Sequence, residues 1–283
     1  MEKLKFAAIA RGQRYSPNHI SNDARILMLT IQHLEEAGYE VRVYDEDSIT
    51  PQLVSENYIF NMIRGSYALT VLQRLEQQGA LVINPTIGIK NCYRSQLAQL
   101  LPKAGILVPT GVVVSTTSIN IRLPFSCTPF KAWIKRGDVH AIHREDVTLV
   151  YSYDEMMGIV HEYHRRGIEN AVIQEHIEGS VVKFYAVKNS GFFHWYYHEG
   201  TGTNPVDPIQ LQAIAEKCAD TLKVDIYGGD AVITDDGSIY IIDLNDWPSF
   251  APVRDVASKN IASLIMAKSL EHEIKHPTLR KTG

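Results

Sequence analysis

The chain has few cysteines and no long apolar run, and each absence excludes a class of protein. Only three of its 283 residues are cysteines, Cys92, Cys127 and Cys218, and none forms a CxxC pair. This spacing fits a reducing compartment better than a disulfide framework. No apolar stretch approaches the roughly 20 residues that a membrane-spanning helix needs. The segment through Tyr15 also lacks the features of a secretory signal, so we expect a cytoplasmic protein without a membrane partner.

An excess of positive charge and a dinucleotide-binding glycine pattern are also missing. Lys and Arg total 28 and Asp and Glu total 32, which gives a formal net charge of −4. This balance argues against a protein that binds DNA or RNA by neutralising phosphates. No GxGxxG follows the first apolar run, so the usual dinucleotide fingerprint is absent. An apolar content of 45% predicts instead a globular chain of one or two domains.

The first 90 or so residues alternate between short apolar runs and amphipathic segments. Strands are expected at residues 5–10, 41–44, 58–62 and 81–83. Glycines that follow the amphipathic segments, Gly38 and Gly79, are placed to end the intervening helices. Strands that alternate with helices form a parallel sheet covered on both faces. The first part of the chain therefore reads as an α/β unit.

The second half has a different pattern, in which short strands follow one another with fewer helices between them. Strands are expected at residues 130–135, 147–151, 171–177, 181–187 and 192–197. Helices are expected at residues 154–166, at 208–222 and from 255 towards 270. This mixture predicts an α+β region, and we place its boundary with the α/β unit between residues 85 and 110.

The sharpest local signal is a β-hairpin near the C-terminus. Asp236-Gly237 lies between two apolar runs, and this dipeptide predicts a two-residue type I′ turn. The turn would set Ile233 opposite Tyr240 and Asp230 opposite Asp243. Facing residues have Cβ atoms about 4.5–5.5 Å apart. The sequence therefore predicts two carboxylates in close proximity.

Two facing carboxylates repel each other unless a cation compensates for them. Val232 and Ile241, their predicted neighbours on the same face, are apolar and would exclude water. Asn245 lies two residues beyond Asp243 and so points to the same face. Carboxylate and amide oxygens are the ligands that Mg²⁺ prefers. We therefore predict a magnesium site at Asp230, Asp243 and Asn245, with a solvated pair of aspartates as the alternative.

A magnesium site implies phosphates, so a phosphate-binding cation should lie elsewhere in the chain. Lys135, at the end of an apolar strand, is the best candidate. Lys183 is an isolated charge within an apolar run, which is costly to bury unless it is paired. Its alternative is an edge-strand position facing water. The polar end of the run at residues 172–177 suits recognition of a purine edge through backbone and carboxylate groups.

In their order along the chain, these elements resemble the ATP-grasp superfamily. The matching segments are INPTIGIKNCYRSQLAQLLPKAGILVPTG at residues 83–111, Lys135, IQEHIEG at 173–179, VKFYAV at 182–187 and IDLNDWPSF at 242–250. The resemblance covers essentially the whole chain. It implies an N-terminal Rossmann-like domain of residues 1–90 and an ATP-grasp domain of residues 91–283. The latter would consist of two α+β subdomains, with residues 128–170 as a mobile lid.

The resemblance also implies ATP and Mg²⁺ as cofactors. The implied ligands are Asp230, Asp243 and Asn245 for Mg²⁺, Lys135 for the phosphates, and Gln174, Glu175 and Ile177 for adenine and ribose. Arg94 stands where many members have a lysine, and an arginine can clamp a phosphate as a bidentate fork. Lys183 stands where many members have an arginine. The glycine-rich lid loop of the superfamily is missing, because only Gly137 follows Lys135 closely.

Two reactions and one non-catalytic role fit this framework. The majority reaction is ligation, as in glutathione synthase and the ribosomal-protein S6 modification ligases, with Arg94, Lys183 and His140 as the catalytic candidates. The alternative is a small-molecule kinase similar to the inositol-polyphosphate kinases of this fold, which the short His140-containing lid resembles. A nucleotide-binding regulator without catalysis is the third hypothesis, and the intact set of metal and phosphate residues argues against it.

The acceptor is expected to be a small molecule or a peptide. Ligands of parallel sheets bind beyond the carboxyl ends of the strands, where the loop after the first strand carries Arg11, Arg14 and His19. Arg64 and His194 are further candidates for contact with the acceptor. We also expect a homodimer as a common state of soluble enzymes, and no nucleic-acid partner.

Overall fold

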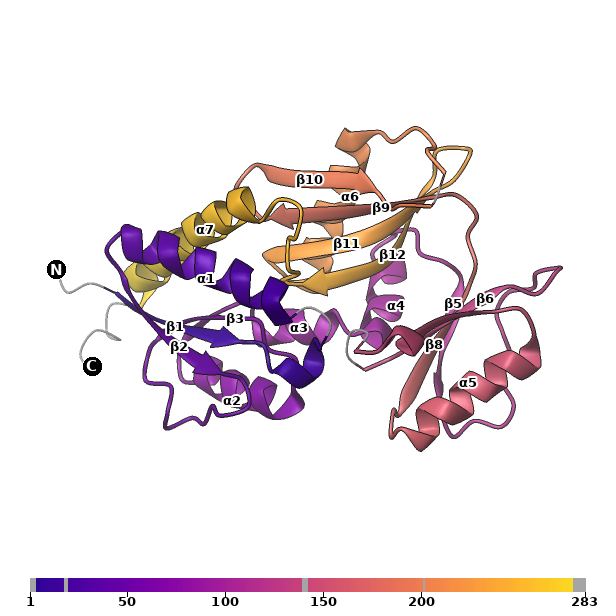
Figure 1. The fold of residues 1–283 in the computed structure, drawn as a ribbon, viewed down its shortest axis with the longest axis horizontal. Coiled ribbons are helices and arrows are strands. Elements are labelled where there is room, and N and C mark those ends of the chain that lie inside the picture. The colour runs from indigo at the N-terminus through magenta and orange to yellow at the C-terminus, as the bar shows by residue number, and fades with distance from the viewer. Residues whose placement is uncertain (1–3, 18–19, 139–141, 201, 277–283) are drawn as a thin grey trace.

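The computed structural model describes residues 4–17, 20–138, 142–200 and 202–276, and Figure 1 shows its three sheets. The N-terminal sheet is parallel, with the strand order β2-β1-β3-β4. The central sheet, β10-β9-β11-β12, and the peripheral sheet, β5-β8-β6-β7, are antiparallel. This arrangement confirms the predicted order of an α/β unit followed by an α+β region.

The N-terminal unit has the alternation of strands and helices that its apolar runs predict. It comprises β1 (Lys5–Ala10), α1 (Ile20–Glu36), β2 (Glu40–Asp45), β3 (Tyr58–Asn61), α2 (Ser66–Gln77) and β4 (Leu81–Ile83). Gly38 adopts a φ of +88°, and the amide of Tyr39 donates to the carbonyl of Leu34 at 3.1 Å. The glycine thus ends α1 as predicted, because it enters the left-handed region at little steric cost.

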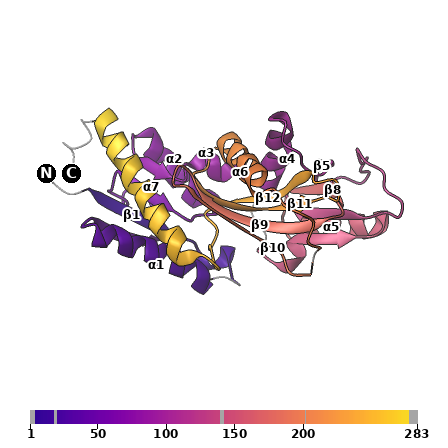
Figure 2. The same cartoon turned by 90° about the horizontal axis from the view of Figure 1, so that it is seen from above.

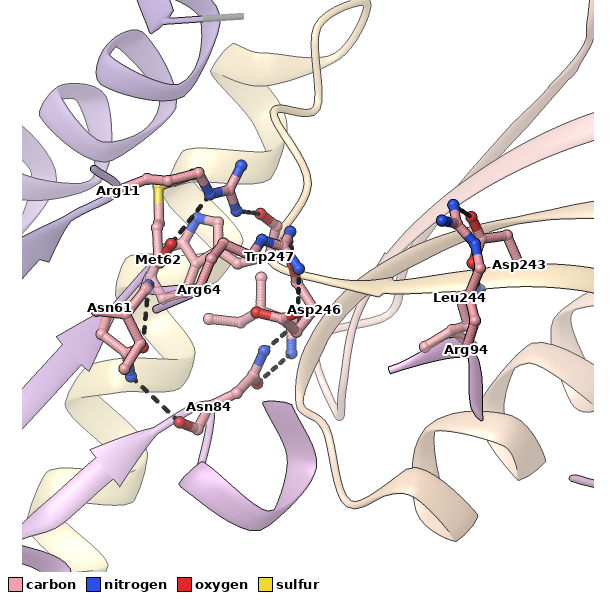
Figure 3. Close-up of polar contacts among 12 residues, drawn as sticks. Arg11, Asn61, Met62, Arg64, Asn84, Arg94, Asp243, Leu244, Asp246 and Trp247 are labelled. Atoms are coloured by element: carbon pink, nitrogen blue, oxygen red, sulfur yellow. Dashed lines mark hydrogen bonds and ion pairs between the residues drawn. The ribbon is translucent and has the colours of Figure 1, made fainter. Parts of the chain in front are cut away.

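A connection through two short helices joins this unit to the other sheets. The helices are α3 (Thr86–Asn91) and α4 (Arg94–Lys103). Before them, the side chain of Asn84 donates to the carbonyl of Ile226 at 2.7 Å and accepts from the amides of Asp225 and Ile226 at 2.8 and 2.9 Å. Asn84 therefore connects the end of β4 to residues 225–226, where strand β11 of the central sheet begins (Figure 3).

The central and peripheral sheets carry the remaining elements. The central sheet has β9 (Ser180–Val187), β10 (Phe192–Tyr197), β11 (Ile226–Ile233) and β12 (Ile239–Asp246), with α6 (Pro208–Leu222) packed against it. The peripheral sheet has β5 (Gly111–Ser115), β6 (Ala132–Arg136), β7 (Val147–Val150) and β8 (Asn170–Glu175), with α5 (Tyr153–Arg165) packed against it. In the described ranges, no helix has both the length and the apolar character to span a membrane.

The C-terminal helix α7 (Arg254–Lys275) returns to the N-terminal unit. Figures 1 and 2 show it beside α1, at the end of the molecule away from the peripheral sheet. Ile261 and Ile265 of α7 share a core with Ile31 of α1 and Phe60 of β3. The domain boundary at residue 90 stays a prediction. The helix α7 belongs to the predicted second domain by sequence, but it packs on the first unit.

The C-terminal hairpin turns through three residues, so the predicted two-residue turn is wrong. Ile233 faces Ile239 and not Tyr240. Gly237 adopts a φ of +79°, and its amide donates to the carbonyl of Thr234 at 2.9 Å. A three-residue loop needs a left-handed residue at this position, which glycine provides.

A β-bulge then restores the predicted pairing of the two aspartates. Ala231 faces Ile241 and Asp230 faces Asp243, so Ile242 is an extra residue on β12. Because of the bulge, Ile241 does not lie on the same face as the two aspartates, so that prediction is wrong. Ile242 lines the cavity described below, whereas Ile241 is buried in the core shared with α6. The carboxylates face each other because the bulge offsets the longer turn.

Candidate functional site

A cavity of about 570 Å³ lies between the central and peripheral sheets. This volume is within the range of about 300–1,000 Å³ that is typical of small-molecule sites. The charged residues of its wall include Arg94, Lys135, Asp230 and Asp243, and the apolar ones include Trp133, Ile177, Val232 and Ile242. The combination of convergent charges with apolar side chains is that of a binding site for a ligand with a charged part and an apolar part.

One face of the central sheet presents a row of polar residues across all four strands. Tyr196, Lys183, Asp230 and Asp243 are consecutive register partners in this row. The Nζ of Lys183 donates to Oδ1 of Asp230 at 2.8 Å. Burial would lower the pKa of Lys183, but the charge and hydrogen bond of Asp230 outweigh it and the pKa is raised. The lone lysine of the apolar strand is therefore paired.

Arg94, the first residue of α4, approaches the second aspartate from the other side. Its Nη2 donates to Oδ2 of Asp243 at 2.7 Å (Figure 3). Burial would raise the pKa of Asp243, but Arg94 and then Lys135 lower it. Arg94 is only 6% exposed, and its Nε and Nη1 are buried without a partner in the described structure. Buried unpaired donors are costly, and Arg94 has two of them beside the cavity that this residue helps to line.

Lys135 reaches the same place from β6. Its Nζ donates to the carbonyl of Ile242 at 2.7 Å, and Ile242 is the bulge residue without a register partner on β11. Burial lowers the pKa of Lys135 to about 8, against the opposing effect of the Asp243 charge. An ammonium group has three donors, and one backbone acceptor leaves two for a ligand.

The two aspartates are suited to a hard cation. Asp230 and Asp243 both line the cavity, and Asn245 lies two residues farther along β12 opposite Gly228. The donors are all oxygen, which fits Mg²⁺. Three acidic, histidine or cysteine side chains do not gather into a metal site anywhere in the described residues. A third protein ligand would therefore come from the Asn245 amide, and the magnesium site stays a prediction.

The predicted adenine residues line the opposite wall of the cavity. Gln174, Glu175 and Ile177 all belong to it. The Oε1 of Glu175 accepts from the amide of Thr110 at 2.8 Å. Trp133, two residues before Lys135 and so on the same face of β6, was not among the predicted site residues.

Trp133 is held in place by the segment after β8. Its Nε1 donates to Nδ1 of His176 at 3.0 Å, and Nε2 of His176 lies 3.2 Å from Glu178 Oε1. Strand periodicity puts Trp133 on the face of Lys135, and this was the signal that could have identified it. The ring provides an apolar surface beside the phosphate-binding candidates.

Two predicted acceptor residues lie in buried ion pairs outside this cavity. Arg11 Nη1 is 2.8 Å from Asp23 Oδ2, and Arg64 Nη1 is 2.6 Å from Asp246 Oδ1. Their side chains are each 6% exposed. The structure thus separates them from Lys135 and Arg94, and their contact with an acceptor stays a prediction.

The other acceptor candidates are also dispersed. Arg14 pairs with Asp47 at 2.8 Å on the surface, and His194 is half-buried on β10. His19 and the catalytic candidate His140 lie outside the described residues. The described part of the chain therefore brings together the predicted ATP and metal residues, but it does not bring the acceptor residues to the same cavity.

No protein-family profile matches the chain, and no curated protein matches it in sequence. Solved structures do match. The D-alanine–D-alanine ligase of Bacillus anthracis complexed with ATP has a TM-score of 0.74 at 16% identity, covering 96% of this chain and 99% of that one. The RimK domain ATP-grasp protein of Sphaerobacter thermophilus has 0.66 at 18%, covering 93% and 99%. The VanG D-Ala:D-Ser ligase of Enterococcus faecalis has 0.68 at 12%, covering 94% and 99%.

Proposed function

Because the chain has the ATP-grasp fold over nearly its whole length, we propose that it is a Mg-ATP-dependent ligase that joins a carboxylate to an amine. The observation that carries this proposal is the pair of buried cations, Arg94 and Lys135, that line a cavity beside two facing aspartates. The matched proteins named as D-alanine–D-alanine and D-Ala:D-Ser ligases support the choice of ligation.

The nucleotide would lie between the two sheets. Lys135 and Arg94 would bind its phosphates, because both are buried cations that line the cavity. Gln174, Glu175 and Ile177 would hold the adenine and ribose along the opposite wall, as their place in the cavity supports.

Asp230, Asp243 and Asn245 would hold Mg²⁺ at the phosphate end of the cavity. The ion neutralises charge on the phosphate oxygens when it is bound. Lys183 and Arg94, which contact these carboxylates, would supply positive charge to phosphate oxygens at the same place, which suits catalysis by positioning and charge neutralisation.

The reaction would proceed in two transfers. A carboxylate oxygen of the acceptor attacks the γ-phosphorus of ATP, the bond to the β–γ bridging oxygen breaks, and ADP leaves. The amine then attacks the acyl carbon and inorganic phosphate leaves, while the amine loses a proton. Lys183, which pairs with Asp230 in the polar row of the central sheet, would stabilise the negative charge that develops in these steps.

Acceptor-dependent product analysis tests this proposal. The full-length protein is incubated with Mg²⁺, ATP and pools of amino acids and short peptides. A ligase releases ADP and inorganic phosphate in equal amounts only when both a carboxylate and an amine are supplied. Phosphate retained on the acceptor would identify the kinase alternative, and ATP binding without turnover in every pool would favour a regulator.

A further inference from the structure

A buried carboxylate in the N-terminal unit, that of Glu46, is surrounded by backbone amides. Glu46 follows β2 directly and is 2% exposed. Its Oε2 accepts from the amide of Gly12 at 2.7 Å, and its Oε1 accepts from the amides of Arg64, at 2.7 Å, and Gly65. Carboxylates that accept several backbone N–H groups form strong, charge-assisted hydrogen bonds. Within the described residues, Glu46 has these amides and no ion-pair partner.

The glycines allow the backbone to approach this carboxylate closely. A Cβ at Gly65 would lie 2.6 Å from the Tyr15 hydroxyl and 3.0 Å from Glu46 Oε1, and one at Gly12 would lie 3.2 Å from Glu46 Oε2. The place is the carboxyl edge of a parallel sheet beside the start of α2, where other α/β units bind an external anion. Here the chain supplies the anion itself, because Glu46 occupies the amides of Gly12, Arg64 and Gly65.

The amides that Glu46 holds belong to two turns whose arginines reach the central sheet. Arg64 Nη1 and Nη2 donate to Oδ1 and the carbonyl oxygen of Asp246 at 2.6 and 3.1 Å. Arg11, next to Gly12, donates from Nη2 to the carbonyl of Trp247 at 3.0 Å. Figure 3 shows both guanidinium groups meeting the end of β12, while Arg94 meets the same strand at Asp243. One carboxylate thus fixes the backbones from which two anchors of β12 extend.

We infer that Glu46 is a positioning residue for the candidate site. Its carboxylate fixes the backbones of Arg64 and Gly12, and their turns hold the end of β12, which keeps Asp243 in register with Asp230. The inference rests on the proposed function, because that function gives Asp243 its role. Without the carboxylate, three amides lose their acceptor, both turns loosen and the end of β12 loses its fixed position.

The test removes the carboxylate and supplies an anion in solution. In Glu46→Ala, kcat should fall on the order of 10- to 100-fold, the size of effect that small misplacements of reacting groups produce, and KM for ATP should change much less. Hydrogen–deuterium exchange at residues 243–247 should become faster. Sodium acetate should restore part of the lost kcat and slow the exchange again, because acetate can accept from the amides of Gly12, Arg64 and Gly65. Sodium chloride of equal ionic strength should have neither effect.

Glu40→Ala is the matched control. Glu40 lies on the same β2 strand, and its carboxylate forms only a surface pair with Lys5 at 3.4 Å. It should leave turnover, exchange and the response to acetate unchanged. A folded Glu46→Ala with wild-type turnover and wild-type exchange at residues 243–247 would overturn the inference.

A second variant keeps the inference testable should Glu46→Ala not fold. Glu46→Gln retains the volume and one acceptor oxygen, so it should show intermediate exchange at residues 243–247, and unchanged exchange would contradict the role of the charge. The exchange measurement does not depend on turnover. An inactive wild type would therefore count against the proposed ligase, whereas the exchange data would still decide the role of Glu46.

Discussion

Three cations surround the two facing aspartates of the candidate site. Asp230 is paired with Lys183 and Asp243 with Arg94, and Lys135 adds a third cation, which donates to the carbonyl of Ile242. The chain as a whole is acidic, with a net charge of −4. The cations nevertheless gather at one end of the cavity, beside Asp230 and Asp243, and a cavity focuses the field of the residues that line it.

The lowered pKa of Lys135 predicts that nucleotide affinity depends on pH. Burial lowers this pKa to about 8, so the amine is charged below that pH and becomes neutral above it. ATP affinity should be constant below about pH 8 and fall by up to roughly tenfold per pH unit above it, since binding needs one proton. Calorimetric titrations between pH 7 and 9.5 measure this, and Lys135→Arg should flatten the dependence. A wild-type affinity that rises with pH would contradict it.

Removal of one carboxylate charge should abolish turnover without unfolding the protein. Asp243→Asn keeps the volume and the contact of Arg94 with an oxygen, but it removes a ligand charge from the predicted magnesium site. We expect a fall in kcat of about 10²–10³-fold or more, measured as acceptor-dependent ADP release, with unchanged circular dichroism. Asp235→Asn, in the loop of the same hairpin, should be near normal. Near-normal turnover in Asp243→Asn would refute the metal assignment.

At the scale of secondary-structure elements, close packing of β11 holds the functional strands together. A Cβ at Gly229 would lie 2.6 Å from the Asp243 carbonyl oxygen and 2.6 Å from Phe184 Cζ. Gly229→Ala should therefore lower the free energy of unfolding by about 1–3 kcal/mol through overpacking. Gly158→Ala, in α5 with no atom within 4 Å of the added Cβ, should raise it by roughly 0.5–1 kcal/mol. Urea denaturation compares them, and equal effects would contradict the packing argument.

Sequence patterns predicted those elements whose periodicity is local and strong. The helix that became α6 and the strands that became β9 and β10 are confirmed within a residue at their ends. The strand β5 was not predicted although its segment contains three consecutive valines, and α3, with six residues, is too short for a helical pattern. The bulge at Ile242 was missed since no turn signal marks it.

The site was predictable to the extent that it depends on neighbouring strands. The hairpin is a local feature, but Asp230 and Asp243 face each other only because the unpredicted bulge at Ile242 offsets the longer turn. The contacts of Arg94 with Asp243 and of Arg64 with Asp246 join residues 149 and 182 positions apart, and no local pattern encodes such pairs. Glu46 was missed for the same reason, because its partners lie on two other turns.

At the scale of the whole molecule, the cavity lies between two sheets, and each sheet has its own hydrophobic core. Ile134 and Ile173 belong to the core of the peripheral sheet, and Phe184 and Leu244 belong to a core of the central sheet. The N-terminal unit and α7 brace the central sheet from the other end (Figure 1). A lid of residues 128–170 stays a prediction, and the separate cores support it, since two packed bodies can shift against each other without breaking either.

Equilibrium binding of a non-hydrolysable ATP analogue in the presence of Mg²⁺ tests the central claim most directly. Calorimetry of the wild type should show one site, and Lys135→Ala should weaken binding at least about tenfold, by the loss of a charged hydrogen bond. Lys131 directly precedes β6, lines the same cavity and pairs with Glu178. The Lys131→Ala variant should bind the analogue with an affinity closer to that of the wild type. A correctly folded wild type that binds no nucleotide, or a Lys135→Ala variant with unchanged affinity, would contradict the phosphate site on which the proposed function depends.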